Sequence, residues 1–159
     1  MTRHEMFFRG SIDRLLELKE LEPDLILDYS IESVKLIDNI IDRYFHNGEP
    51  LKSMFFSEHT EFRITSLAAY VGEVIVKNTQ GTKWVFVADN KFNGVLLETE
   101  LKSANGLTMW PGVKTVKRIK NGAEDGLYSY ASYAVGEIIN GNIKSTEQKK
   151  KNKAWWKFW

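Results

Sequence analysis

The hydrophobic positions along the chain are most regular between residues 60 and 89. From Thr60 to about Asn78, apolar side chains recur at the three- and four-residue spacing of a helix. Only a narrow strip with Ser66, Glu73 and Lys77 is polar. The pattern predicts a central helix, capped by Thr60 and covered by neighbours on several sides. Its apolar face comprises Ile64, Leu67, Ala68, Val71, Val74 and Ile75, extended by Ala69, Tyr70 and Val76.

Strand patterns follow this helix. Gln80-Gly81 predicts a turn, and the β-branched and aromatic run from Trp84 to Ala88 predicts a strand. After a hairpin-type loop at Asp89–Gly94, the segment Val95–Leu101 alternates in the manner of a second strand. Leu107–Trp110 is a third, short strand pattern that ends at Pro111-Gly112. One expected face of the second strand carries Val95, Leu97, Thr99 and Leu101, and the other carries Leu96, Glu98 and Glu100.

Further helices are predicted on both sides of this region. Ser11–Leu21 predicts a helix with Ile12, Leu15 and Leu16 inward. Residues 31–45 predict a second, capped by Asp28 or Ser30 and stopped by Asn47-Gly48. Val113, Val116 and Ile119 favour a short helix, and Ala123–Asn140 predicts the last core helix. Its inward residues are Leu127, Tyr130, Ala131, Ala134, Val135 and Ile138.

Composition and charge narrow the classes of function. The 159 residues contain no cysteine, which excludes disulfides, thiolate–zinc sites and cysteine nucleophiles. Residues 144–159 carry six lysines and one glutamate, a charge of +5, so the total of +1 leaves −4 on the other 143 residues. The three histidines form no metal-binding spacing. We therefore expect no metal, no cofactor and no catalytic residue.

Several short motifs between residues 66 and 125 resemble a bacterial domain family of unknown function. They are Gly72-Glu73 within the central helix, Trp84 at the start of a strand, the Asp89–Gly94 hairpin, Pro111, and the pair Lys117-Arg118. The resemblance covers less than half of the chain. Small bacterial proteins of this style often serve as immunity partners of secreted toxins, so the resemblance implies a protein partner of that kind.

Two candidate sites lie in the body of the chain. Glu98 and Glu100 are expected on the outer sheet face, beside a loop that contains Asp89, Asn90, Lys91 and Phe92. They form either an ordinary solvated face or an acidic patch for a basic partner such as a nuclease toxin. Glu73 forms either a surface pair with Lys77 or a groove carboxylate that faces Lys117 or Arg118. Gly72 is expected to permit close helix packing.

The last residues combine lysines with aromatic side chains. This tail carries Lys149, Lys150, Lys151, Lys153, Trp155, Trp156, Phe158 and Trp159. Tryptophan and lysine together suit a membrane–water interface with anionic lipid. They also suit docking onto the protein itself or onto a second copy in a homodimer. Single-stranded nucleic acid is the least favoured of these partners.

These patterns together predict an α+β fold in which helices pack on one face of a small antiparallel sheet of two or three strands. We expect a single domain at residues 1–143 and a tail at 144–159. The interpretation is a cytoplasmic, non-enzymatic binding protein, most concretely an immunity protein that neutralises a toxin. The alternative is a peripheral membrane or scaffold protein that uses the tail at the inner face of the membrane. An enzyme with Glu73 and Lys117 or Arg118 is the third interpretation.

Overall fold

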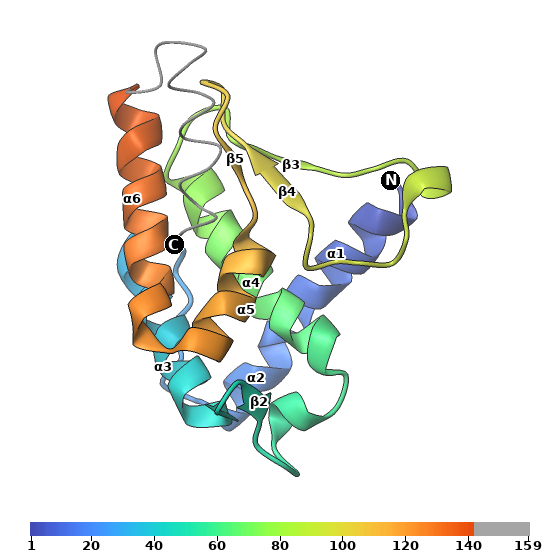
Figure 1. The fold of residues 1–159 in the computed structure, drawn as a ribbon, viewed down its shortest axis with the longest axis vertical. Coiled ribbons are helices and arrows are strands. Elements are labelled where there is room, and N and C mark those ends of the chain that lie inside the picture. Colours follow the sequence, from blue (N-terminus) through green and yellow to red (C-terminus); the bar gives the residue numbers. More distant parts are fainter. Residues whose placement is uncertain (142–159) are drawn as a thin grey trace.

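The computed structural model describes residues 1–141, and its fold is α+β as predicted. Helix α4 (Thr60–Lys77) runs through the middle and contacts α1, α2, α3, α5 and α6 (Figure 1). Its apolar residues are buried from Ile64 to Ile75, which confirms the prediction of an enclosed central helix. The polar strip is narrower than expected because Ser66 is also buried and its hydroxyl donates to the Phe62 carbonyl.

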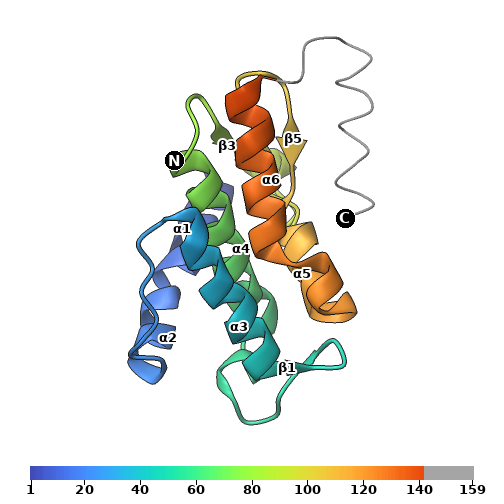
Figure 2. The same ribbon diagram turned by 90° about the vertical axis from the view of Figure 1, so that its left-hand side faces the viewer.

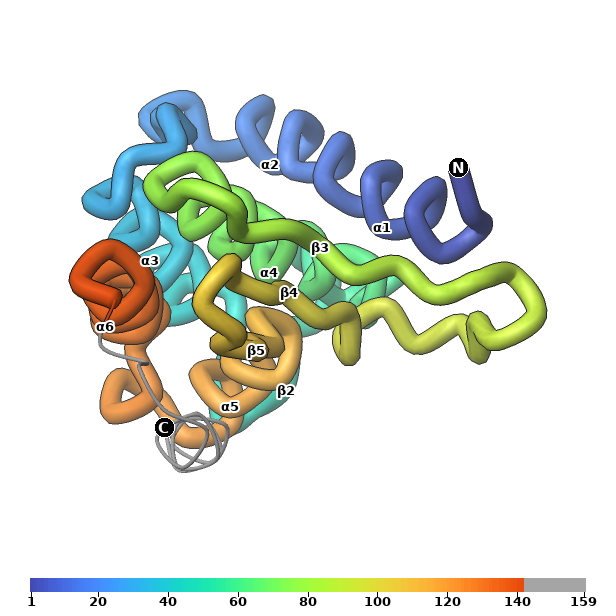
Figure 3. Tube along the Cα trace, turned by 90° about the horizontal axis from the view of Figure 1, so that it is seen from above, coloured from blue at the N-terminus to red at the C-terminus, as the bar shows by residue number. Residues whose placement is uncertain are grey.

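The N-terminal region forms two helices in place of the single one predicted. Helix α1 (Arg3–Asp13) starts well before Ser11, and α2 (Leu15–Leu21) follows after a break at Arg14. The two lie almost end to end along one edge of the molecule (Figure 3). Leu15 and Leu18 are buried, whereas Leu16 is 63% exposed, so its predicted inward position is wrong.

Helix α3 (Val34–Tyr44) confirms the second predicted helix, after a 3-10 turn η1 (Ile31–Ser33). The Ser30 hydroxyl caps that turn by accepting from the Ser33 N–H at 3.1 Å. Asn47-Gly48 does not stop the helix but forms the tip of a hairpin between β1 (Phe45–His46) and β2 (Glu49–Pro50) (Figure 2). Both tip residues have positive φ, 51° and 83°, which a two-residue hairpin turn of this type requires. The connection to α4 contains a 3-10 turn η2 (Phe55–Ser57).

A three-stranded antiparallel sheet has the order β3-β4-β5. Its strands are β3 (Lys83–Val85), β4 (Glu100–Lys102) and β5 (Thr108–Met109), shorter than predicted. Residues 86–99, which we call the arm, project from the sheet beside α1 and contain the 3-10 turn η3 (Asp89–Lys91) (Figure 3). The predicted alternation over 95–99 is wrong, because the Thr99 N–H and hydroxyl both donate to the Leu96 carbonyl and turn the chain there.

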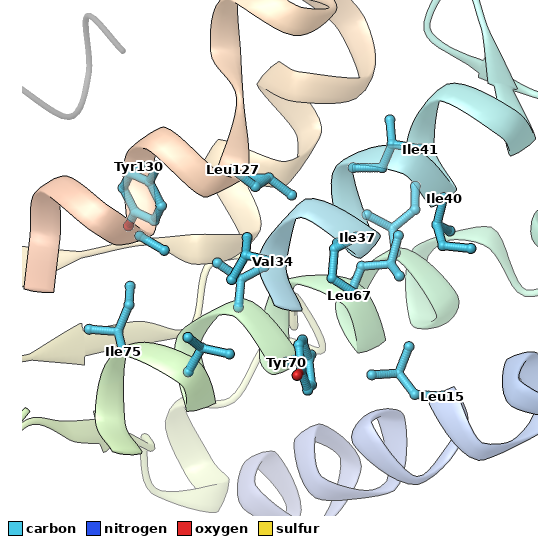
Figure 4. Packing of buried hydrophobic residues seen from close by; sticks show 14 of the residues in the cluster. Leu15, Val34, Ile37, Ile40, Ile41, Leu67, Tyr70, Ile75, Leu127 and Tyr130 are labelled. Atoms are coloured by element: carbon cyan, nitrogen blue, oxygen red, sulfur yellow. The ribbon is translucent and has the colours of Figure 1, made fainter. Parts of the chain in front are cut away.

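Helices α5 (Pro111–Asn121) and α6 (Leu127–Asn140) complete the fold, with a 3-10 turn η4 (Ala123–Asp125) between them. In the core, Leu67, Tyr70 and Ile75 of α4 meet residues of α2, α3 and α6 (Figure 4). A smaller cluster under the arm contains Phe8 and Leu96. Helix α4 contacts both α1 and α5, and residues 95–98 of the arm lie close to the start of α4 and to α5.

Candidate functional site

A groove of about 680 Å³ lies between the start of α4, residues 95–99 of the arm and α5. We call residues 95–99 the return limb of the arm, and residues 86–88 its outgoing limb. This volume is within the range of about 300–1,000 Å³ that is typical of ligand sites. Five of its ten lining residues are aliphatic and five are polar or charged, and most of its surface is apolar. The aliphatic residues are Ile64, Val95, Leu97, Val113 and Val116, and the polar ones are Thr60, Glu61, Glu98, Lys117 and Lys120.

Helix α5 contributes its valines to the groove because it buries a different face. Lys114 is 1% exposed and Arg118 is 3% exposed, whereas Val113 and Val116 are only half-buried. Charged side chains are seldom buried unless they are paired, and aliphatic ones are usually covered first. Helix α5 thus buries two charged residues together with Ile119 and leaves Val113 and Val116 partly exposed. It leaves an apolar surface that nothing in residues 1–141 fully covers.

Arg118 is held by two carboxylates of α3. Its Nε donates to Asp38 Oδ1 at 2.9 Å, and its Nη2 donates to Asp42 Oδ1 at 2.7 Å. Asp38 also accepts the first backbone N–H groups of α6, from Leu127 at 3.0 Å and Tyr128 at 2.9 Å. Burial favours the neutral guanidine, but the bonds to Asp42 and Asp38 outweigh it and keep the pKa of Arg118 above its ordinary value. One carboxylate therefore joins α3, α5 and α6.

Lys114 has a second buried pair. Its Nζ donates to Asp125 Oδ1 at 2.6 Å, and Asn121 Nδ2 donates to the other carboxylate oxygen at 2.6 Å. Burial raises the pKa of Asp125, but the hydrogen bonds from Lys114 and Asn121 together lower it by more. The pKa of Asp125 therefore lies below its usual range. These bonds fix the rotation of α5 about its axis and hence the side that faces the groove.

Gly112 sets the distance between α5 and the arm. A Cβ atom there would lie 2.0 Å from the Leu97 carbonyl oxygen, far inside van der Waals contact. Only glycine allows the two backbones to approach so closely. The close approach places Val95, Leu97 and Glu98 opposite the valines of α5.

The charges around the groove are separated by sign. Glu61 belongs to α4 and Glu98 to the arm, whereas Lys117 and Lys120 belong to α5. Within residues 1–141, Glu61, Glu98 and Lys120 make no ion pair. The groove therefore takes its acidic side chains from α4 and the arm and its basic side chains from α5.

The structure separates the residues that the sequence grouped into an acidic sheet face. Glu98 is exposed and lies outside any strand, and Glu100 is half-buried on β4 with its carboxylate 3.6 Å from Lys102 Nζ. The prediction that both glutamates lie on one sheet face is wrong, because the turn at Leu96–Thr99 ends the expected alternation. Of the two glutamates, only Glu98 lines the groove.

The Asp89–Gly94 loop lies at the far end of the arm. Asp89, Asn90 and Lys91 are exposed, and Asp89 accepts the Arg3 backbone N–H at 2.6 Å. Phe92 is half-buried and stacks on His4 with ring centroids 4.7 Å apart. The loop is thus fastened to α1 and is separate from the residues that line the groove.

Glu73 has a structural partner. It accepts the Trp84 indole N–H at 2.6 Å, while Lys77 lies over the Tyr29 ring at 4.7 Å. A Cβ on Gly72 would lie 2.2 Å from the Trp84 ring, so Gly72 allows this close contact with a side chain. The predicted partners of Glu73 are Lys77 and either Lys117 or Arg118. Its oxygen Oε1 instead accepts from the Trp84 indole.

The groove itself was not predicted from the sequence, and the signal for it is faint. The spacing of Val113, Val116 and Ile119 predicts a short helix but not the face that it buries. Of the partners of the buried Lys114 and Arg118, that of the arginine is remote in sequence, since Asp38 is 80 positions from Arg118. The tail from Lys149 to Trp159 lies outside the described residues.

Comparisons with known proteins identify no relative: no family model matches, and no curated protein or solved structure shows significant similarity. None of the helices within residues 1–141 has the length and apolar character needed to cross a membrane. The same residues contain no cluster of three or more histidine or acidic side chains that could hold a metal ion.

Proposed function

We propose that this protein is a non-enzymatic binding protein whose groove receives a segment of a protein partner. The single observation that carries the proposal is the burial pattern of α5, where Lys114 and Arg118 are buried while Val113 and Val116 line an open groove. An open aliphatic groove of this size, formed here by α4, the arm and α5, is the kind of site that accepts an amphipathic helix. Most of the surface of the groove is apolar, and its charged side chains come from three separate elements, α4, the arm and α5.

The charges define the partner segment. An aliphatic stripe would lie on the floor, with basic residues beside Glu61 and Glu98 and acidic residues beside Lys117 and Lys120. Such a segment has opposite charges on the two sides of its apolar face. A segment bound in the opposite direction would bring like charges together. The charged side chains of the groove therefore select the direction of the bound segment as well as its composition.

Selection of peptides on the full chain tests this proposal. A displayed peptide library is panned at neutral pH, and the selected peptides are measured by fluorescence anisotropy. Val95→Asp places a charge on the groove floor at a residue that is 37% exposed. Leu16→Asp is the matched control, because Leu16 is an exposed aliphatic residue outside the groove. We expect V95D to weaken binding at least about tenfold and L16D to leave it unchanged.

A charge exchange adds a test of direction. Lys120→Glu is expected to weaken the same peptides, and a peptide with its facing acidic residue changed to lysine is expected to regain affinity for K120E. Failure to select any peptide with an aliphatic stripe contradicts the proposal. So do selected peptides that bind V95D and K120E as tightly as the unaltered chain.

A narrower form of the proposal is that the partner is a toxin domain, as the family resemblance implies. The arm carries Glu98 at the groove and the exposed loop with Asp89, so both would contact such a partner. A gene for a large secreted protein beside the gene for this chain, and rescue of growth when the two are co-expressed, would support this form. Co-expression without rescue would contradict it and leave the groove proposal standing.

A further inference from the structure

The imidazole of His4 uses both of its nitrogens to hold the arm on α1. The Val87 N–H donates to Nδ1 at 3.1 Å, so Nδ1 carries a lone pair. Nε2 therefore carries the proton and donates to Thr99 Oγ1 at 2.8 Å. The Thr99 hydroxyl in turn donates a hydrogen bond to the Leu96 carbonyl at 2.6 Å. The bonding partners thus determine a single neutral tautomer.

The same ring packs between aromatic residues of the arm. His4 is 4% exposed; it stacks on Phe92 with an interplanar angle of 5° and meets Phe86 edge-on at 5.3 Å. Val87 and Phe86 lie on the outgoing limb, Phe92 lies after the tip, and Thr99 lies on the return limb. One side chain therefore ties three points of the arm to α1.

A second proton on His4 has no acceptor in this arrangement. It would sit on Nδ1 and face the Val87 N–H, which places two donors against each other. Asp89 is occupied by the Arg3 backbone, and Arg9 is paired with Glu5 at 2.9 Å while lying over Phe86. No carboxylate among residues 1–141 bonds to the ring. The arm's other charged side chains, Lys91 and Glu98, are exposed.

Burial independently favours the neutral ring. It lowers the pKa of His4 below its ordinary value. The stacked Phe92 face would attract an imidazolium and so acts in the opposite direction. That contact does not replace the hydrogen bond from Val87. After protonation the Val87 N–H faces a second donor on Nδ1, and the Phe92 ring does not serve as its acceptor.

The return limb connects this histidine to the groove. Val95, Leu97 and Glu98 line the groove, and Thr99 follows directly. We propose that His4 is a pH-sensitive latch: a proton taken from solvent onto Nδ1 breaks the bond from Val87, releases the arm from α1 and dismantles one wall of the groove. Partner binding consequently weakens in mildly acidic solution. Only this last consequence rests on the proposed function.

Hydrogen exchange measured by NMR on the full chain tests the latch. The ratio of latched to released arm is expected to fall by up to about tenfold per pH unit below about pH 6.5, the ordinary histidine pKa. After correction for intrinsic exchange, the protection of the Val87 and Thr99 amides should fall between about pH 7.5 and about pH 5. The protection of Val71 in α4 should stay constant. Equal protection of Val87 at both pH values would overturn the proposal.

Two further measurements keep the outcome clear. The nitrogen chemical shifts of the His4 ring should show a neutral ring with the proton on Nε2. The pKa of His4 measured from these shifts should lie below about 6.5, and a pKa at or above that value overturns the latch. His4→Phe keeps an aromatic ring and removes the titration, so the arm amides should lose their pH dependence. His46→Phe, at an exposed histidine on β1, is the matched control and should keep it.

Binding of a peptide selected on the groove separates the two proposals. The unaltered chain should lose affinity between about pH 7.5 and about pH 5, and H4F should not. If no peptide binds at neutral pH while the Val87 amide still loses protection in acid, the groove proposal fails and the latch stands. If a peptide binds and Val87 keeps its protection, the latch fails and the groove proposal stands.

Discussion

Asp38→Ala is the most informative perturbation of the scaffold behind the groove. The change removes the acceptor of Arg118 Nε and of the Leu127 and Tyr128 amides in one step. Arg118 stays buried and keeps Asp42, whose side chain is 63% exposed, together with the backbone carbonyl of residue 38 at 3.4 Å. The variant therefore leaves a buried guanidinium with a single, solvent-exposed carboxylate and leaves the start of α6 without the side chain that accepts its first N–H groups.

The magnitude follows from these two losses. Breaking a buried ion pair by removing one partner costs about 3–5 kcal/mol, and losing a helix N-cap costs about 0.5–2 kcal/mol. The losses share atoms and do not add, and Asp42 retains part of the attraction. We expect D38A to lower the free energy of unfolding by about 3–4 kcal/mol. For comparison, Asp42→Ala removes a largely exposed partner of the same arginine and should cost about 0–1 kcal/mol.

Urea unfolding followed by far-UV circular dichroism measures both variants, provided that the slope of the free energy against urea stays constant. Arg118→Met is then combined with D38A. Removing the stranded charge should recover at least about 1 kcal/mol relative to D38A alone. A loss below about 1 kcal/mol for D38A, or a double variant less stable than D38A, would refute the assignment of Asp38 as the partner that makes a buried Arg118 tolerable.

Three further predictions concern the glycines and the buried histidine. Gly112→Ala places a Cβ 2.0 Å from the Leu97 carbonyl, so it should cost about 1–3 kcal/mol in urea unfolding and raise exchange in the return limb; unchanged exchange there would contradict the close approach. Gly72→Ala forces the Trp84 ring aside and should cost a similar amount, and adding Trp84→Leu should recover part of it; no recovery would contradict the contact. Because burial lowers the pKa of folded His4, the unfolded chain binds more protons: stability should be full above about pH 6.5 and fall as the pH falls toward the folded-state pKa, whereas H4F should be flat in that window by urea titration.

Much of the helical framework is determined by local patterns. The buried face of α4 and the inward residues of α6 follow from periodicity. Apolar residues spaced by three and four lie on one side of a helix, and that side packs against the core. Ser30 caps its helical turn as the sequence indicates. The turn at Asn47-Gly48 also follows from residue type, but its use in a hairpin depended on β1 and β2 pairing across it. Positive φ is a local property, whereas strand pairing is not.

The site was decided by contacts between distant residues. The spacing of Val113, Val116 and Ile119 predicts that α5 is a helix but not which face it buries, and Asp38 and Asp125 decide that face by supplying partners for Arg118 and Lys114. The alternation over residues 95–99 fails for a related reason, since the arm is fastened to α1 through a histidine that lies 95 positions from its partner Thr99. A sequence window reports how each residue prefers water or the interior. Only the assembled structure supplies the carboxylates that make the burial of Arg118 and Lys114 tolerable.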